Sequence, residues 1–255
     1  MAKLPKKFCD RVRAKLKGYQ SLVSSHRKKD VSEADTITVI KDVLSDVLGY
    51  EKYSELTSEH QIRGTFCDLA VQVDGKVRYL IEAKSAGSDL TQNHLRQAVN
   101  YGAHKGIEWI ILTNAVEWRV YKIKFAQPID YELVFSFSLP ELNPRSDDHL
   151  GKLFLLSREA IGGDAIGAFH EHNLVANPYT IAQIVLSEPV VAVIRREMRR
   201  YFPDVKLSAD AISDLLNAGV LKREVIEGDR SVEAKARLKK ASQRLARAAK
   251  KSAKA

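Results

Sequence analysis

The sequence predicts an α/β fold, in which helices flank a mixed central sheet, plus a smaller and mostly helical C-terminal region. Two observations lead to this prediction. Apolar residues recur at helical spacing before and after a block of strand-like segments that lies between about residues 59 and 124. A stretch rich in Pro, Asn, Ser and Asp around 139–145 then separates this block from a region with mainly helical patterns.

The first half of the chain is predicted to run helix, three strands, helix, two strands. Helices are expected over 6–29, from a cap at Asp30 or Ser32 to Leu48, and over 90–104 with Ser88 as the cap. Strands are expected over 59–63, 65–73, 77–83, 108–113 and 117–124. Asp74-Gly75 is a typical two-residue hairpin turn between the second and third strands. The nearly continuous apolar run of 77–83 predicts a central strand covered on both faces.

The second half is predicted to be mostly helical. Helical patterns cover 150–168, with a break at Gly162-Gly163, then 179–201 and 208–218, and a strand-like segment follows at 220–225. Residues 232–254 are polar and rich in Ala, Lys and Arg, which predicts a helix or a disordered tail. The expected division is a basic helix at 1–30, an α/β domain at 31–138, a helical domain at 146–228 and a basic tail at 229–255.

Positive charge is concentrated at both ends of the chain. The net charge is +9, but residues 1–30 carry +8 and residues 234–255 carry +9, which leaves the middle at −8. Basic ends attract polyanions, of which nucleic acid is the commonest, although solvated tails that only aid solubility fit the same pattern. The charge distribution therefore favours nucleic acid as a partner without deciding it.

Several classes of protein are excluded by simple patterns. No apolar run approaches the roughly 18–20 residues that span a membrane, and the basic N-terminus lacks the apolar segment of a secretory signal. Two widely separated cysteines, Cys9 and Cys67, provide neither a disulfide framework nor a zinc site. We therefore expect a cytoplasmic protein with no membrane partner.

The residues that carry chemistry converge on the predicted hairpin. Asp68 lies on its first strand, and Glu82 and Lys84 end its second strand two positions apart, so their side chains project to one face. Two carboxylates and a lysine in one place are costly unless a cation joins them. Mg²⁺, which takes oxygen ligands and substrate phosphate, meets that need. An ordinary Glu/Lys pair at a strand end remains the alternative for Glu82 and Lys84 taken alone.

The ordered set of motifs resembles the N-terminal nuclease domain of type I restriction enzyme R subunits, within the PD-(D/E)xK superfamily. The resemblance covers about residues 30–125 and is carried by residues 32–36, 48–50, 66–70, 81–84 and 96–101. It implies a restriction-endonuclease-like core and a metal-dependent nuclease. It also implies that Asp68, Glu82 and the carbonyl of Ala83 bind the metal and that Lys84 is the catalytic lysine.

The resemblance implies three further site residues. A glutamate on the first helix of the domain often completes the metal site, which points to Glu33, with Asp35 as the nearby rival. Gln97 and Tyr101 match the Gln-x-x-x-Tyr motif, and their spacing of four places them on one helix face. Gln97 would then bridge to phosphate or to the site, and Tyr101 would donate to phosphate. The alternative is a solvated Gln97 and a Tyr101 that packs on the sheet.

Two departures from the family pattern limit what can be carried over. Cys67 stands where the family's nominal proline precedes the aspartate, which leaves the metal ligands intact. No Gly-x-x-x-x-Gly-Lys-[Ser/Thr] loop occurs in the chain, so the motor of type I enzymes is absent from it. A motor or specificity subunit would have to be a separate protein, and a homodimer is a further option.

These observations predict a Mg²⁺-dependent deoxyribonuclease, with Mn²⁺ as a substitute, that acts in restriction, defence or DNA processing. Two alternatives stay open. One is a catalytically weak or inactive DNA-binding or interaction protein on the same fold, and the other is a nuclease directed at RNA.

Overall fold

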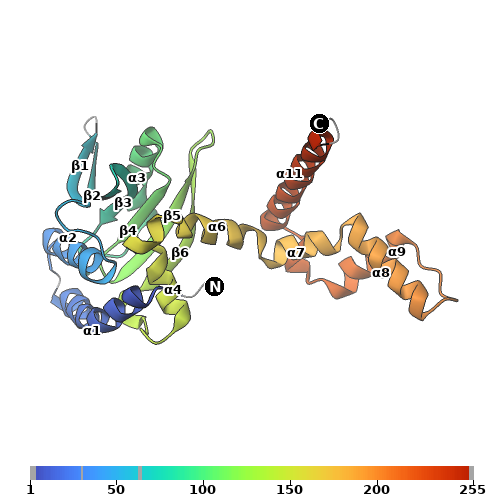
Figure 1. The fold of residues 1–255 in the computed structure, drawn as a ribbon, viewed down its shortest axis with the longest axis horizontal. Coiled ribbons are helices and arrows are strands. Elements are labelled where there is room, and N and C mark those ends of the chain that lie inside the picture. Colours follow the sequence, from blue (N-terminus) through green and yellow to red (C-terminus); the bar gives the residue numbers. More distant parts are fainter. Residues whose placement is uncertain (1–3, 30, 63–64, 253–255) are drawn as a thin grey trace. The chain divides into compact units, whose positions relative to one another are not determined.

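The structure is a computed structural model that describes residues 4–29, 31–62 and 65–252. The chain divides into two units, residues 1–168 and residues 169–255. The first unit is α/β and the second is helical over its described residues, and each is considered by itself (Figure 1).

A six-stranded sheet forms the centre of the first unit. Its strands lie side by side in the order of the sequence, and only β3 and β4 are parallel. The strands are β1 (Leu56–Ile62), β2 (Thr65–Val73), β3 (Lys76–Ala83), β4 (Trp109–Thr113), β5 (Glu117–Lys124) and β6 (Asp130–Ser138). The predicted mixed sheet between helices is thus confirmed. The sixth strand was not predicted, although apolar side chains recur at every second position from Tyr131 to Phe137.

The β2–β3 hairpin has the predicted turn. Asp74 and Gly75 both have positive φ, at 53° and 72°, as a two-residue type I′ turn requires. Val73 therefore pairs with Lys76. After a bulge at Val71/Gln72 the ladder continues to the pair Leu69–Ile81, which brings Asp68 to the same end of the sheet as Glu82.

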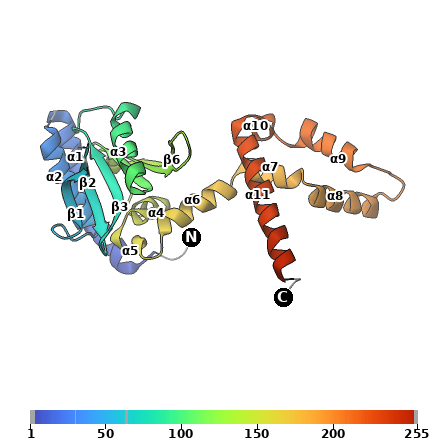
Figure 2. The ribbon, with the colours of Figure 1, turned by 90° about the horizontal axis from the view of Figure 1, so that it is seen from above.

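Helix α3 (Gln92–Lys105) covers one face of the sheet, and α1 (Lys6–Lys29) and α2 (Glu33–Asp42) lie on the opposite side (Figure 2). Ser32 caps α2 and accepts a hydrogen bond from the amide of Asp35, and a π-helical turn (Val43–Val47) continues the helix to Leu48. Thr91, rather than the predicted Ser88, is the cap residue of α3. The Ser88 hydroxyl is instead 2.6 Å from that of Ser85.

The face of the sheet beneath α3 is closed by a large apolar cluster. Its buried members come from β2 to β5, α3 and the adjoining loops: Cys67, Ala70, Leu80, Leu90, Leu95, Ala98, Val99, Tyr101, Ile107, Ile110, Leu112, Tyr121 and Ile123. At roughly 1.5–3 kcal/mol for each large buried aliphatic side chain, this burial is the main favourable term that holds α3 to the sheet.

The segment after β6 packs onto the first unit rather than standing apart from it. A short 3₁₀ turn (Leu139–Glu141), α4 (Asp147–Leu155) and α5 (Arg158–Ile161) follow the sheet. Phe154 of α4 meets Phe8 edge to face, with 5.3 Å between ring centroids. Arg158 forms a 2.6 Å ion pair with Glu55, and its amide donates to the carbonyl of Leu48. These contacts tie α4 and α5 to the N-terminal helices.

The second unit is built from helices connected by short turns. They are α6 (Ala165–Val175), which spans the boundary between the units, α7 (Pro178–Val185), α8 (Glu188–Tyr201), α9 (Ala209–Leu215), a π-helical turn η3 (Leu216–Val220), α10 (Arg223–Ile226) and α11 (Asp229–Ser252). The predicted strand at 220–225 is wrong. This segment enters α10, since the unit offers no strand among its described residues with which it could pair.

In the part of the chain that the structure describes, we find no helix with the length and apolar character needed to span a membrane.

Gly49 has a conformation that only glycine adopts easily. Its φ is +87°, and a Cβ at this position would lie 2.6 Å from Nη2 of Arg11. Arg11 donates to the carbonyl of Val47 at 3.0 Å and is ion-paired with Glu159 at 2.7 Å. Gly49 therefore allows α1, the end of the π-helical turn and α5 to meet.

We predict that Gly49→Ala lowers the free energy of unfolding of the first unit by about 1–3 kcal/mol, because it adds backbone strain and displaces Arg11. Urea unfolding followed by tryptophan fluorescence measures this, since Trp109 and Trp118 both lie in the first unit. The matched control is Gly18→Ala, which meets open space on α1 and should be stabilising by about 0.5–1 kcal/mol. Equal effects of the two substitutions would contradict the role given to Gly49.

Candidate active site

The candidate site lies where β3 leaves the sheet. The last strand residues are Glu82 and Ala83, and Lys84 follows them. The amide of Lys84 donates to the carbonyl of Thr113 on β4 at 2.9 Å. The parallel pairing with β4 thus continues one residue past the strand and fixes the backbone from which the Lys84 side chain projects.

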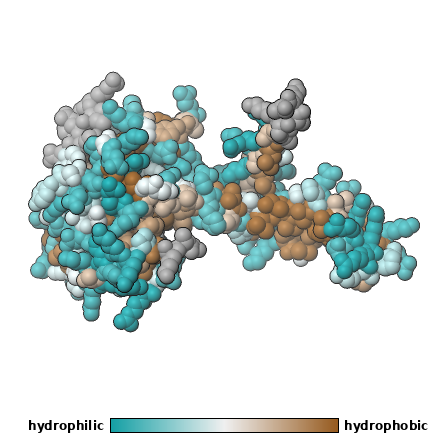
Figure 3. All heavy atoms as spheres, in the orientation of Figure 1, coloured by the Kyte–Doolittle hydropathy of each residue, from teal (hydrophilic) through white to brown (hydrophobic). Residues whose placement is uncertain are grey.

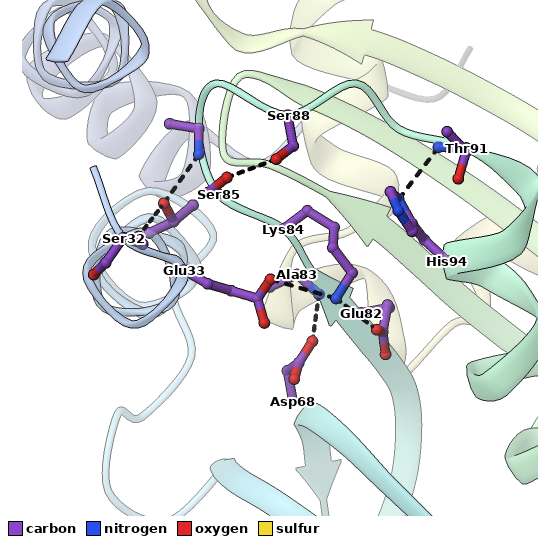
Figure 4. Close-up of polar contacts among 12 residues, drawn as sticks. Ser32, Glu33, Asp68, Glu82, Ala83, Lys84, Ser85, Ser88, Thr91 and His94 are labelled. Atoms are coloured by element: carbon purple, nitrogen blue, oxygen red, sulfur yellow. Dashed lines mark hydrogen bonds and ion pairs between the residues drawn. The ribbon is translucent and has the colours of Figure 1, made fainter. Parts of the chain in front are cut away.

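Asp68 joins the site through the backbone of β3. The regular β2–β3 ladder stops at Leu69–Ile81, and beyond it the amide of Ala83 donates to Oδ2 of Asp68 at 2.7 Å (Figure 4). A side-chain carboxylate thus bonds a β3 amide just beyond the last ladder pair. Because Ala83 lies between Glu82 and Lys84 in the sequence, this hydrogen bond holds the Asp68 carboxylate next to both residues.

The Lys84 ammonium bridges two carboxylates from distant parts of the sequence. Its Nζ lies 2.9 Å from Oε1 of Glu82 and 3.5 Å from Oε2 of Glu33, the first residue of α2 (Figure 4). Asp35, the rival candidate, accepts a hydrogen bond from the hydroxyl of Ser32 at 2.8 Å. Of the two acids near the start of α2, it is therefore Glu33 that contacts Lys84.

Burial and charge act together on the ionisation of this cluster. Glu82 is only 4% exposed, and this burial, with the charges of Asp68 and Glu33, raises its pKa even though Lys84 opposes the shift. Burial alone would lower the pKa of Lys84, but the hydrogen bond to Glu82 and the three surrounding carboxylates raise it. Lys84 therefore keeps its proton at neutral pH. Burial, followed by the charges of Glu82 and Asp68, also raises the pKa of Cys67 to about 12.

The donor set fits a divalent cation in chemistry and in charge. Asp68, Glu82 and Glu33 carry three negative charges when ionised, against the single positive charge of Lys84. Hard carboxylate and backbone oxygens are the ligands that Mg²⁺ prefers. Among the described residues, however, no three His, Cys, Asp or Glu side chains come together as a ready-made metal cluster. In this arrangement the Lys84 ammonium contacts both Glu33 and Glu82.

A set of buried polar residues positions the loop that follows Lys84. The Thr36 hydroxyl, on α2, accepts from the amide of Ala86 at 3.2 Å and donates to the carbonyl of Ser32 at 2.9 Å. The side chain of Asn114 donates to the carbonyl of Ser88 at 2.8 Å. No role for Thr36 or Asn114 was predicted from the sequence. Thr36 lies within the motif at 32–36, but neither its place there nor the polarity of Asn114 after a buried strand says which group it contacts.

Gln97 and Tyr101 lie on α3 in different environments. Gln97 is exposed. Tyr101 is 3% exposed and belongs to the apolar cluster under α3, and burial, followed by the nearby Cys67, raises its pKa to about 12. These positions match the packing alternative, and the roles of both residues on phosphate stay predictions. His94 accepts from the amide of Thr91 at 3.3 Å and so completes the cap of α3.

Comparison with known families identifies one similarity. Residues 39–134 match the family described as the type I restriction enzyme R protein N terminus. The matched segment runs from within α2 to the middle of β6, so it includes Asp68, Glu82 and Lys84 and leaves Glu33 outside. No curated protein and no solved structure matches the chain. The resemblance to the N-terminal region of restriction R subunits is thus supported over the part of the sheet that carries the candidate site.

The raised pKa of Glu82 predicts a pH dependence of stability. A carboxyl with a higher pKa in the folded chain than in the unfolded chain binds protons more tightly when folded. The free energy of unfolding therefore falls as pH rises from the ordinary value of 4.5 through the folded value. Glu82→Gln cannot titrate, so its stability relative to wild type should increase over that pH range and then level off.

Urea unfolding of both proteins at a series of pH values from about 4 to 7 measures this difference. Lys84 stays charged over this range, and its attraction to ionised Glu82 is already part of the net shift of the Glu82 pKa, so it adds no separate titration to the difference. Glu51→Gln removes an exposed carboxylate from the same unit and is the control. A difference for Glu82→Gln that is independent of pH would show that burial does not disfavour its ionised form.

Proposed function

We propose that this chain is a metal-dependent endonuclease that hydrolyses DNA phosphodiester bonds, with Asp68, Glu82 and Lys84 at its centre. The observation that carries the proposal is the convergence of these three side chains at one end of β3. The amide of Ala83 is 2.7 Å from the Asp68 carboxylate, and the Lys84 ammonium is 2.9 Å from that of Glu82. The match of this segment to the restriction R protein N terminus supports the same function.

In this proposal Asp68, Glu82, Glu33 and the carbonyl of Ala83 hold Mg²⁺, or Mn²⁺ in its place. The bound ion would supply Lewis-acid stabilisation of the charge that develops on the phosphate. Glu82 would contribute a buried carboxylate. Lys84, which is ion-paired with it, would turn its ammonium group from Glu33 toward the substrate. Lys84, which keeps its proton, would donate a hydrogen bond to a phosphate oxygen or orient the attacking water. Gln97, which is exposed on α3, would contact the phosphate backbone.

The biological setting proposed is restriction, defence or DNA processing in the cytoplasm. The R proteins that define the matched family belong to restriction enzymes, and separate motor or specificity subunits are the partners proposed for this chain. The basic helix α1 would add sequence-independent attraction to DNA.

We predict that the protein nicks or linearises plasmid DNA in the presence of Mg²⁺ or Mn²⁺ and that Glu82→Ala and Lys84→Ala each lower the cleavage rate by about 100-fold or more. Glu82→Ala would remove a ligand of the metal, and Lys84→Ala would remove the ammonium that acts on the phosphate or the attacking water. Gel analysis of supercoiled, nicked and linear plasmid measures the rate. Lys76→Ala, an exposed lysine at the other end of β3, is the matched control and should leave the rate unchanged.

The same assay separates the alternatives. A protein that binds DNA with no metal-dependent cleavage would be the inactive DNA-binding protein, and cleavage of RNA but not DNA would redirect the function to RNA. Cleavage that persists in Glu82→Ala or Lys84→Ala would refute the assignment of the site. Tyr101→Phe tests whether the Tyr101 hydroxyl donates to phosphate. Loss of such a hydroxyl would lower the cleavage rate, whereas the rate would not change if only the ring of Tyr101 matters for packing.

A further inference from the structure

Helix α11 carries an apolar seam with the spacing of a coiled coil. Five small or apolar residues alternate at intervals of three and four: Ser231, Ala234, Leu238, Ala241 and Leu245. Residues at this spacing lie along one stripe of a helix and pack against a partner helix as knobs into holes. The spacing therefore suits packing against another helix along the whole seam.

Only the first half of this seam has its partner within the second unit. Ser231 is 4% exposed and Ala234 is fully buried, and α11 packs here against α7. Gln183 of α7 donates to the hydroxyl of Ser231 at 3.0 Å, and Arg230 lies over the ring of Tyr179. Farther along the same stripe Leu238 is half-buried, Ala241 is exposed, and Leu245 is 72% exposed. An established helix contact thus continues into an open apolar surface.

A groove lies beside the seam, between α11 and the helices that precede it in this unit. It has a volume of about 1140 Å³, and Leu238 and Ser242 of α11 face Leu186, Ala218 and Ile226 across it. Asp214 and Glu227 lie on its far wall, and Lys235 and Lys239 line the α11 wall. Figure 3 shows hydrophobic side chains over α7 and part of the way along α11 in this unit. The groove thus exposes apolar side chains that a second helix could cover, and its basic residues lie on the α11 side.

The charges beside the seam select the partner. Arg237 and Arg244 flank it on one side, and Lys235 and Lys239 lie on the other. From residue 234 onward the helix has no acidic residue, and Glu233, one of the two acids before it, is ion-paired with Arg237 at 3.5 Å. A second copy of α11 would place arginine and lysine against arginine and lysine, which is unfavourable in a coiled coil. A helix with acidic residues beside its own apolar seam complements this pattern.

We propose that residues 235–245 of α11, with the adjoining groove, dock an acidic amphipathic helix of a separate protein. A phosphate backbone would satisfy the basic residues but would leave Leu238, Ala241 and Leu245 in water. The exposed leucine seam therefore favours a protein helix over nucleic acid. This proposal does not depend on the nuclease function, because it concerns the other unit and needs neither metal nor substrate.

The test uses the full chain without metal and two labelled four-heptad peptides. Both have leucine at the two seam positions, and they differ in having either glutamate or lysine at all flanking positions. Fluorescence anisotropy should show binding of the glutamate peptide at least about tenfold tighter than binding of the lysine peptide. Leu245→Asp should weaken binding of the glutamate peptide about tenfold or more, since it replaces the most exposed apolar contact of the seam with a charge that repels the peptide.

Ala236→Asp is the matched control, because it adds the same charge to an exposed position on the opposite side of α11. It should have a clearly smaller effect than Leu245→Asp. The proposal is overturned if the glutamate peptide does not bind, or if the two substitutions weaken binding of the glutamate peptide equally. It is also overturned if duplex DNA displaces the peptide and both substitutions weaken DNA binding alike, since α11 would then be a nucleic-acid element.

Discussion

The candidate site depends on one ion-pair arrangement, in which Lys84 holds Glu82 and Glu33 on either side of its ammonium group. Glu82 is nearly fully buried, and an isolated buried carboxylate would be strongly unfavourable. Lys84 reduces that cost, and the position of Lys84 in turn depends on the hydrogen bond that its backbone amide donates to the carbonyl of Thr113. The parallel β3–β4 pair, the start of α2 and the β2–β3 hairpin all meet at this point. A change in any of them would leave one charge of the cluster without its partner.

Local patterns in the sequence were enough to predict most of the first unit. The Asp74-Gly75 turn sets the start of the β2–β3 register, and counting residues from it predicts that Asp68 lies near the end of β3. The bulge at Val71/Gln72 then shifts the pairing by one residue toward Glu82. The apolar run of β3 likewise predicts its central place in the sheet. These features depend on short-range chemistry, which a single sequence contains. The expectation of strand structure at 220–225 was wrong because the same short apolar pattern suits a strand or a helix, and only the surrounding elements decide.

The details that could not be predicted are those that depend on contacts between distant residues. The resemblance pointed to Glu33 with Asp35 as its rival, and only the structure shows that Glu33 contacts Lys84 while Asp35 accepts a hydrogen bond from Ser32. The burial of Tyr101 depends on how α3 rotates on the sheet, which spacing alone does not fix. Thr36 and Asn114 join the site through backbone groups more than 20 residues away. The proximity of Asp68, Glu82 and Lys84 could thus be predicted from the sequence, whereas the contact with Glu33 and the residues that position the cluster could not.

The parallel pairing of β3 with β4 affects the order in which the parts of the site can form during synthesis. Two parallel neighbours cannot be joined by a tight turn, so α3 must cross over the sheet before β4 can pair with β3. During synthesis, Glu33, Asp68, Glu82 and Lys84 all leave the ribosome about 30 or more residues before Thr113 does. The nascent chain therefore carries every acidic and basic group of the site before the backbone that anchors Lys84 exists. Assembly of the site is thereby delayed until the sheet closes around it.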